Sequence, residues 1–198
     1  MRAASDVAPD GSAITCADVA YGVSRTFAGD VISGGPTYAI NFLDIPKDGY
    51  PGPYKATADQ QALFDKAVSC SADGRTVTFN LKVPVADFNA TVTLPAFSPV
   101  PKKADTGEAY GKHPVSSGPY RIESYEAGKQ AVFVRNSNWK QDSDPVRQAY
   151  PDKFVWQFGL DSTVIDERLI ADKGDDQTAI TPDGVLPENL PTVFGDDA

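Results

Sequence analysis

The stretch HPVSSGPYRIESYEAGKQAVFVRNSNW, from His113 to Trp139, decides the fold of this part of the chain. Residues 116–119 have turn composition, because glycine adopts unusual φ values and proline fixes φ. In the segment 120–124 that follows, Tyr120, Ile122 and Ser124 alternate with the charged residues Arg121 and Glu123. Residues 127–129 favour a chain reversal, and the β-branched and aromatic run 130–135 is typical of a strand. The stretch therefore predicts a turn followed by a β-hairpin.

Another strand is expected earlier in the chain than this hairpin. Asp73-Gly74 is a strong turn signal, and the residues from 76 to Pro84 alternate strictly between apolar and polar. This period is that of a half-buried strand, which proline ends. The side chains expected to face the core are those of Val77, Phe79, Leu81 and Val83.

Helices are expected on both sides of these strands. Thr15 and Thr57 are candidate N-caps, followed three residues later by Asp18 and Gln60. A short helix is expected over residues 38–43, and another after Asp161 or Ser162. Strands are expected over 154–160 and 178–180. The apolar faces predicted for the first two helices comprise Val19, Val23 and Phe27, and Leu63, Phe64 and Ala67.

Composition and charge limit the possible functions. The 198 residues are 41% hydrophobic, which is enough for a sizeable core, and the 16 Gly and 16 Pro favour short elements joined by turns. A formal net charge of −9 argues against nucleic acid or an anionic membrane surface as a partner. The sequence has no run of 18 apolar residues and no secretory signal pattern, so we expect neither a membrane span nor a signal or anchor in this chain.

Residue types for catalysis or metal binding are sparse. Cys16, Cys70 and His113 lack the spacing of a zinc site. Ser116 or Ser117 near His113 has no G-x-S-x-G elbow around it and no third partner in view. We therefore expect no catalytic residue, no metal and no cofactor. On sequence alone, the two cysteines are equally compatible with a disulfide and with two buried thiols.

Several of these segments together resemble the family 5 solute-binding proteins, the peptide- and nickel-type receptors of bacterial ABC importers. In that family a turn ending in Gly-Pro-Tyr opens a strand, and an Arg-Asn-x-x-Trp/Tyr motif closes the next one. The capped helix that begins at residue 15 and the strand that ends at Pro84 also resemble family segments, and phrases at 36–38 and 140–147 resemble the version found in high-GC Gram-positive bacteria. The matching motif positions are Gly118, Pro119, Tyr120, Arg135, Asn136 and Trp139.

The resemblance implies an α+β fold: part of a periplasmic-binding-protein class II-like lobe, with mixed sheet pieces and flanking helices. A complete family member is about two to three times longer, so the chain is expected to be a fragment. The resemblance implies an accessory α/β subdomain over 14–103 and a middle segment of the first lobe over 104–181. The small and polar residues at the start and the Pro-, Gly- and Asp-rich residues at the end predict loose tails over 1–13 and 182–198.

The implied function is capture of peptides or similar solutes for an ABC importer, with permease subunits as partners and a monomeric state. The implied location is the extracellular face of the membrane, with a lipid anchor in the full-length protein. An extracellular location favours a disulfide between Cys16 and Cys70. Candidate cleft residues are Ser117, Gly118, Tyr120 and Trp139, of which Tyr120 and Trp139 stand at element ends beside turns. The alternatives are a secreted hydrolase domain or a cell-surface interaction module.

Overall fold

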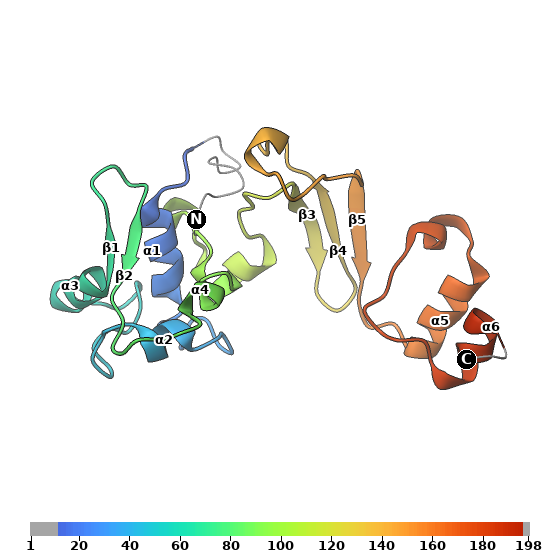
Figure 1. Ribbon diagram of the computed structural model, residues 1–198, viewed down its shortest axis with the longest axis horizontal. Coiled ribbons are helices and arrows are strands. Elements are labelled where there is room, and N and C mark those ends of the chain that lie inside the picture. Colours follow the sequence, from blue (N-terminus) through green and yellow to red (C-terminus); the bar gives the residue numbers. More distant parts are fainter. Residues whose placement is uncertain (1–11, 196–198) are drawn as a thin grey trace. The chain divides into compact units, whose positions relative to one another are not determined.

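The computed structural model describes residues 12–195, so the predicted tail at 1–13 lies almost wholly outside the described residues (Figure 1). The described chain is α+β, as the sequence predicts. Short 3-10 turns connect many of its elements. The helices are α1 (Cys16–Arg25), α2 (Tyr38–Phe42), α3 (Ala58–Ala67), α4 (Phe88–Thr91), α5 (Ser162–Ala171) and α6 (Leu190–Phe194). The strands are β1 (Val68–Cys70), β2 (Val77–Phe79), β3 (Tyr120–Glu126), β4 (Gln130–Arg135) and β5 (Lys153–Gln157).

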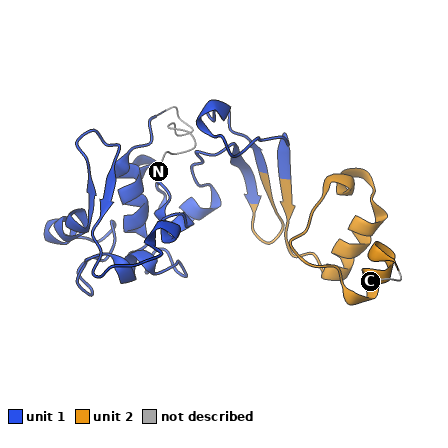
Figure 2. Ribbon diagram, viewed as in Figure 1, with its two compact units in different colours: residues 1–125, 133–154 blue, residues 126–132, 155–198 orange. Residues whose placement is uncertain are grey.

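The chain divides into two compact units, which Figure 2 shows in different colours. Unit 1 comprises residues 1–125 and 133–154, and unit 2 comprises residues 126–132 and 155–198. The boundary expected at residue 103 stays a prediction. None of the helices among residues 12–195 is long and apolar enough to cross a membrane.

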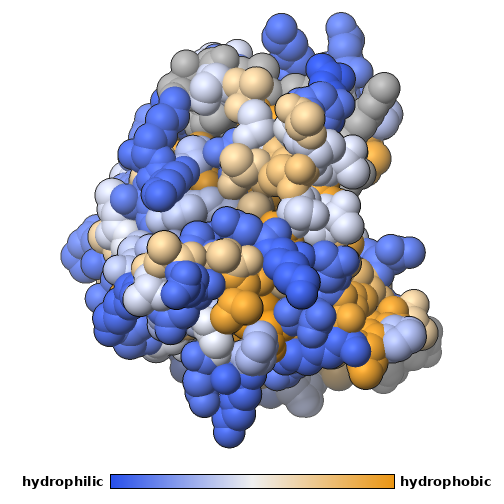
Figure 3. Space-filling model, turned by 90° about the vertical axis from the view of Figure 1, so that its left-hand side faces the viewer, coloured by the Kyte–Doolittle hydropathy of each residue, from blue (hydrophilic) through white to orange (hydrophobic). Residues whose placement is uncertain are grey.

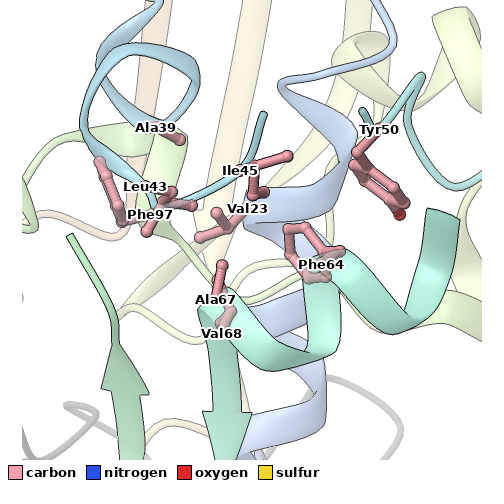
Figure 4. Packing of buried hydrophobic residues seen from close by; sticks show 9 residues of the cluster. All are labelled: Val23, Ala39, Leu43, Ile45, Tyr50, Phe64, Ala67, Val68 and Phe97. Atoms are coloured by element: carbon pink, nitrogen blue, oxygen red, sulfur yellow. The ribbon is translucent and has the colours of Figure 1, made fainter. Parts of the chain in front are cut away.

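The main core lies in unit 1, between α1, α2, α3 and the β1–β2 hairpin. Thr57 caps α3 by accepting from the Gln60 backbone N–H at 3.3 Å, and Asp18 accepts from the Thr15 N–H at 2.8 Å at the start of α1. These caps fix where each helix begins, so their apolar faces meet. Figure 4 shows the buried cluster, which consists of Val23, Ala39, Leu43, Ile45, Tyr50, Phe64, Ala67, Val68 and Phe97.

A disulfide between Cys16 and Cys70 joins the first residue of α1 to the last residue of β1, with a Cα–Cα distance of 5.7 Å. The Cys16 N–H also donates to the Gly74 carbonyl at 2.8 Å. The tip of the β1–β2 hairpin is therefore tied to the N-terminus of α1 by a covalent bond and a hydrogen bond. The expected disulfide is confirmed.

Strand β2 is shorter than the sequence predicts. It pairs antiparallel with β1 from Val77 to Phe79, and Leu81 then forms an isolated bridge with Leu43. The prediction that Val83 faces the core is wrong, because its side chain is 62% exposed. The ladder between β1 and β2 ends at Phe79, and the chain then forms hydrogen bonds with residues 42–44. Val83 therefore has no β1 residue opposite it. Likewise Leu63, predicted to be buried, is 38% exposed.

The hairpin predicted at 120–135 is confirmed as β3 and β4, which with β5 form a three-stranded sheet in the order β3-β4-β5. All five side chains of the edge strand β5 are exposed. Among them are Phe154 at 37%, Val155 at 44% and Trp156 at 56%. The strand expected over 154–160 is therefore present but shorter, and it has no buried face within the described residues.

In unit 2, α5 begins after Asp161, whose carboxylate accepts from the Thr163 N–H at 2.9 Å. The predicted strand at 178–180 is wrong: Thr178 ends a 3-10 helix that begins at Gly174, and Ile180 is 94% exposed. The acidic and glycine-containing run before it favours a turn over a strand. Residues 187–194, for which the sequence predicts no element, form a 3-10 turn and α6.

Candidate functional site

The turn that precedes β3 is shaped by its own polar atoms. The Ser116 hydroxyl donates to the Tyr120 carbonyl at 2.5 Å and accepts from the Gly118 N–H at 3.2 Å. Serine and glycine are residues that allow such a tight local bonding pattern. The turn is therefore held by hydrogen bonds within its own residues.

Asn136 ties this turn to the end of β4. Its amide nitrogen donates to the Ser116 carbonyl at 3.0 Å and to the Gly118 carbonyl at 2.9 Å. Its amide oxygen accepts from the Asn138 N–H at 3.1 Å, and its backbone N–H donates to the Pro119 carbonyl at 2.8 Å. The side chain is buried and fully used, as a buried amide must be. The Asn of the Arg-Asn-x-x-Trp motif thus positions the Gly-Pro-Tyr turn.

The adjacent Arg135 holds the loop that leads into β5. Its Nη1 and Nη2 atoms donate to the carbonyls of Ala149 at 2.7 Å and Tyr150 at 3.1 Å, while Nε bonds Asp152 at 2.9 Å. Ala149 has a φ of 52°, which is unusual for a residue with a side chain. The guanidinium therefore holds two successive carbonyls of this loop and the Asp152 carboxylate that follows them.

Asp144 organises the other end of this loop. It is 3% exposed and accepts hydrogen bonds from Trp139 Nε1 at 3.2 Å and from Arg147 Nε at 2.6 Å. The backbone N–H groups of Val146 and Arg147 also donate to it, each at 3.3 Å. Burial alone would raise the pKa of Asp144, but the bonds from Arg147 and Trp139 outweigh burial and lower the pKa below its usual range. The carboxylate therefore stays charged at neutral pH.

Between the turn and the loop lies an open groove of about 490 Å³. Tyr120 is one of its lining residues. Its hydroxyl donates to the Pro151 carbonyl at 2.6 Å, and its ring meets that of Phe154 edge to face with ring centroids 4.7 Å apart. Both contacts join the turn to the far side of the loop, so the groove is preformed. Its lining comprises Ser116, Gly118, Pro119, Tyr120, Arg147, Gln148, Ala149, Tyr150, Pro151 and Phe154.

The four candidate cleft residues take different places. Gly118 and Tyr120 line the groove. Ser117 is half-buried in the same turn and is not among the lining residues. Trp139 is half-buried and supports Asp144 through its indole N–H. The structure thus brings two of the candidates together at one groove, and Trp139 is not among its lining residues. A ligand-binding role for any of them stays a proposal.

The residues weighed for catalysis or metal binding are separated or otherwise engaged. Cys16 and Cys70 are bonded to each other, the Ser116 hydroxyl is bonded to a carbonyl, and His113 lies exposed. Among residues 12–195, no group of three or more His, Cys, Asp or Glu side chains is arranged to hold a metal ion.

Sequence reasoning missed the loop side of the groove. Arg147 and Tyr150 sit in a polar, proline-containing segment that has no periodicity. The available signal was the density of hydrogen-bonding residue types between Trp139 and Asp152, which is high for a stretch with no α-helix or strand. Loops of this kind are held by side-chain bonds, and such loops carry many binding sites.

The described chain has the α+β fold of oligopeptide-binding proteins. The structure titled "Clavulanic acid biosynthesis oligopeptide binding protein 2" is 42% identical and superimposes with a TM-score of 0.75, covering 83% of this chain and 29% of that chain. OppA of Haemophilus influenzae, in complex with the peptide RPPGFSPFR, is 16% identical with a TM-score of 0.67, covering 96% and 36%. Listeria monocytogenes OppA bound to peptide is 19% identical with a TM-score of 0.62, covering 88% and 33%.

The family model described as bacterial extracellular solute-binding proteins, family 5 middle, matches residues 9–192, so the chain belongs to this family. The expected resemblance is confirmed at this level. The chain spans about a third of the length of the structures that it matches. The comparison with curated proteins gives no significant match.

Proposed function

We propose that this chain is part of the solute-binding component of an ABC importer that captures peptides for uptake. The observation that carries the proposal is the 42% identity to an oligopeptide-binding protein over 83% of the chain. A preformed groove beside the Gly118-Pro119-Tyr120 turn supports it, because peptide receptors need rigid surfaces that do not lose entropy on binding.

In this proposal the full-length protein acts as a monomer at the extracellular face of the membrane, held by a lipid anchor, and delivers its solute to permease subunits. It traps solute by closure of two lobes and performs no covalent chemistry. The family and the matching structures are those of binding proteins, and no observation favours the hydrolase or interaction-module alternative.

Calorimetry with a mixed peptide pool tests the proposal on two proteins, the 198-residue chain and a longer protein that contains it. The longer protein should bind measurably. The 198-residue chain should bind weakly or not at all, because one wall of a cleft buries only part of a ligand. Absence of binding by the longer protein would contradict the proposed function. Micromolar binding by the 198-residue chain would instead show that the complete site lies within these residues.

A further inference from the structure

The Arg147 guanidinium is anchored on one side and open on the other. Its Nε donates to the buried Asp144 carboxylate at 2.6 Å, while 48% of the side-chain surface stays exposed. Within residues 12–195, the hydrogen bonds of this guanidinium all use Nε, so the two Nη groups keep their donors for a ligand. An arginine held in this way presents a fixed pair of donors without a further loss of side-chain entropy.

Gly118 lets the guanidinium lie against the turn. A Cβ built on Gly118 would stand 3.2 Å from Arg147 Nη1, which is tighter than ordinary van der Waals contact. The Arg147 guanidinium therefore lies close against the turn at Gly118. This position belongs to the Gly-Pro-Tyr turn, so the turn and the loop meet at the donors.

Asp144 does not need Arg147 to fill its hydrogen-bonding capacity. Three uncharged donors already reach its carboxylate, namely the Trp139 indole N–H and the backbone N–H groups of Val146 and Arg147. The guanidinium is the further, charged donor, and Arg147 is one of the residues that line the groove.

The groove around Arg147 combines one cation with apolar walls. Among its described lining residues, Arg147 is the charged one, in a chain whose net charge is −9. The Tyr120 hydroxyl is used by Pro151, so its ring offers an apolar surface, and the Tyr150 side chain is 82% exposed beside it. A volume of about 490 Å³ lies in the range of small-ligand pockets and suits the end of a peptide.

We propose that this groove is a carboxylate subsite, in which the Nη groups of Arg147 bind the C-terminal carboxylate of a short peptide. The apolar side chain of the last residue lies against Tyr120 and Tyr150. The inference rests on the proposed function and deepens it by naming a ligand group and its anchor. The same carboxylate chemistry can come from a peptide C-terminus or from a glutamate side chain, and the experiment separates the two.

The test uses NMR of the 198-residue chain with nitrogen-15 labelling, which detects millimolar binding at the Gly118 amide and at the Arg147 Nε–H. Three peptides are compared: Ala-Ala-Phe with a free C-terminus, the same peptide as its amide, and Ala-Glu-Phe amide. The free acid should bind about five- to tenfold more tightly than the amide, because it adds charge-assisted hydrogen bonds at a partly exposed site. Added salt should reduce the preference.

Variants assign the preference to Arg147. R147Q should bind the acid and the amide alike, and R147K, which keeps a positive charge beside Asp144, should restore part of the preference. R75Q makes the same change at an exposed arginine in the β1–β2 turn and should behave as wild type. Unchanged urea midpoints across the variants exclude unfolding as the cause.

Equal affinity of wild type for acid and amide would overturn the inference, as would a preference that survives in R147Q or an absence of shifts at Gly118 with every peptide. Binding of Ala-Glu-Phe amide as tight as that of the free acid would overturn the assignment to the peptide C-terminus, because a glutamate side chain would then serve equally well. If the longer protein still binds peptides when the acid preference is absent, only this inference fails. If the longer protein binds no peptide, the proposed function fails.

Discussion

At the residue scale, single buried polar side chains hold the irregular segments of this chain. Asn136 bonds two carbonyls of the turn before β3, and Asp144 gathers donors from the loop before β5. Asp105 joins its own segment to Tyr21 and Arg25 of α1 and to Tyr54. In each case one side chain bonds several groups at once, which is why its loss costs more than one hydrogen bond.

Replacement of Asn136 by alanine leaves the carbonyls of Ser116 and Gly118 without their side-chain donor. Each unsatisfied buried polar group costs about 1–3 kcal/mol, so we expect N136A to lose about 2–4 kcal/mol in the free energy of unfolding. Urea titration measures the loss. N89A, at an exposed position in α4, is the matched control and should change little; equal losses would contradict the role of Asn136.

Asp105 accepts from the hydroxyls of Tyr21 at 2.7 Å and Tyr54 at 2.6 Å, and Arg25 Nη2 lies 3.2 Å from it. Burial alone would raise the pKa of Asp105, but these partners and the Gly107 N–H lower it below its usual range. A carboxyl with a depressed folded-state pKa adds stability above its unfolded pKa of about 3.9. That stability is lost as the pH falls through the folded value.

We therefore expect D105N to be less stable than wild type by about 2 kcal/mol at pH 7, with the difference shrinking below about pH 4. Urea titrations between pH 3 and pH 7 provide the measurement. A difference that stays constant over this range would show that the Asp105 charge does not contribute to stability.

At the element scale, the alternation of polar and apolar residues predicts where a strand lies, but not where its pairing with a neighbouring strand ends. The alternation from 76 to Pro84 continues past the end of β2, yet the chain changes partners after Phe79 and pairs near Leu43. Periodicity records side-chain polarity and contains no information on the neighbouring strand. Val83 therefore fits the pattern and is exposed.

The candidate site shows the same division. Gly118 belongs to a strong turn pattern and Tyr120 begins a predicted strand, so this side of the groove could be predicted from the sequence. The loop wall with Arg147 depends on bonds from Arg135 to carbonyls 14 and 15 residues further along the chain. Tertiary bonds of this kind leave no periodic trace in the sequence.

Phe79 offers a test of the β2 register. Its ring is half-buried and meets the rings of Phe88 at 5.6 Å and Phe97 at 5.7 Å. We expect F79A to cost about 3 kcal/mol, near the low end for aromatic-to-alanine changes because the ring is partly exposed. T78A, on the exposed opposite face, should cost far less. Equal losses for the two variants in urea titrations would refute this register.

At the scale of the whole molecule, the disulfide between Cys16 and Cys70 constrains the core of unit 1. Cys16 and Cys70 are 54 residues apart in sequence, and the segment between them contributes most of the buried cluster around Phe64. Figure 3 shows mostly hydrophilic side chains on the face that it displays, interrupted by apolar groups. The stability of the core therefore depends on the cross-link as well as on burial.

Removal of this cross-link frees the unfolded chain more than the folded one. In the chain-entropy model a loop of this length is worth about 4 kcal/mol, so we expect the reduced protein to unfold at a clearly lower urea concentration. The double variant C16A/C70A should behave like the reduced protein and should be indifferent to reductant. Alkylation of both cysteines in the unreduced native protein would contradict the disulfide.

The exposed strand β5 has a consequence for how the isolated chain behaves in solution. An edge strand with Val155 and Trp156 open to water is a template on which a second molecule can add its own strand. The formal charge of −9 keeps molecules apart at neutral pH, and this repulsion vanishes near the isoelectric point of about 4.5. We therefore expect the tendency of the chain to aggregate to depend on pH. Aggregation should be lowest at mildly alkaline pH and low salt, where the repulsion between molecules is strongest.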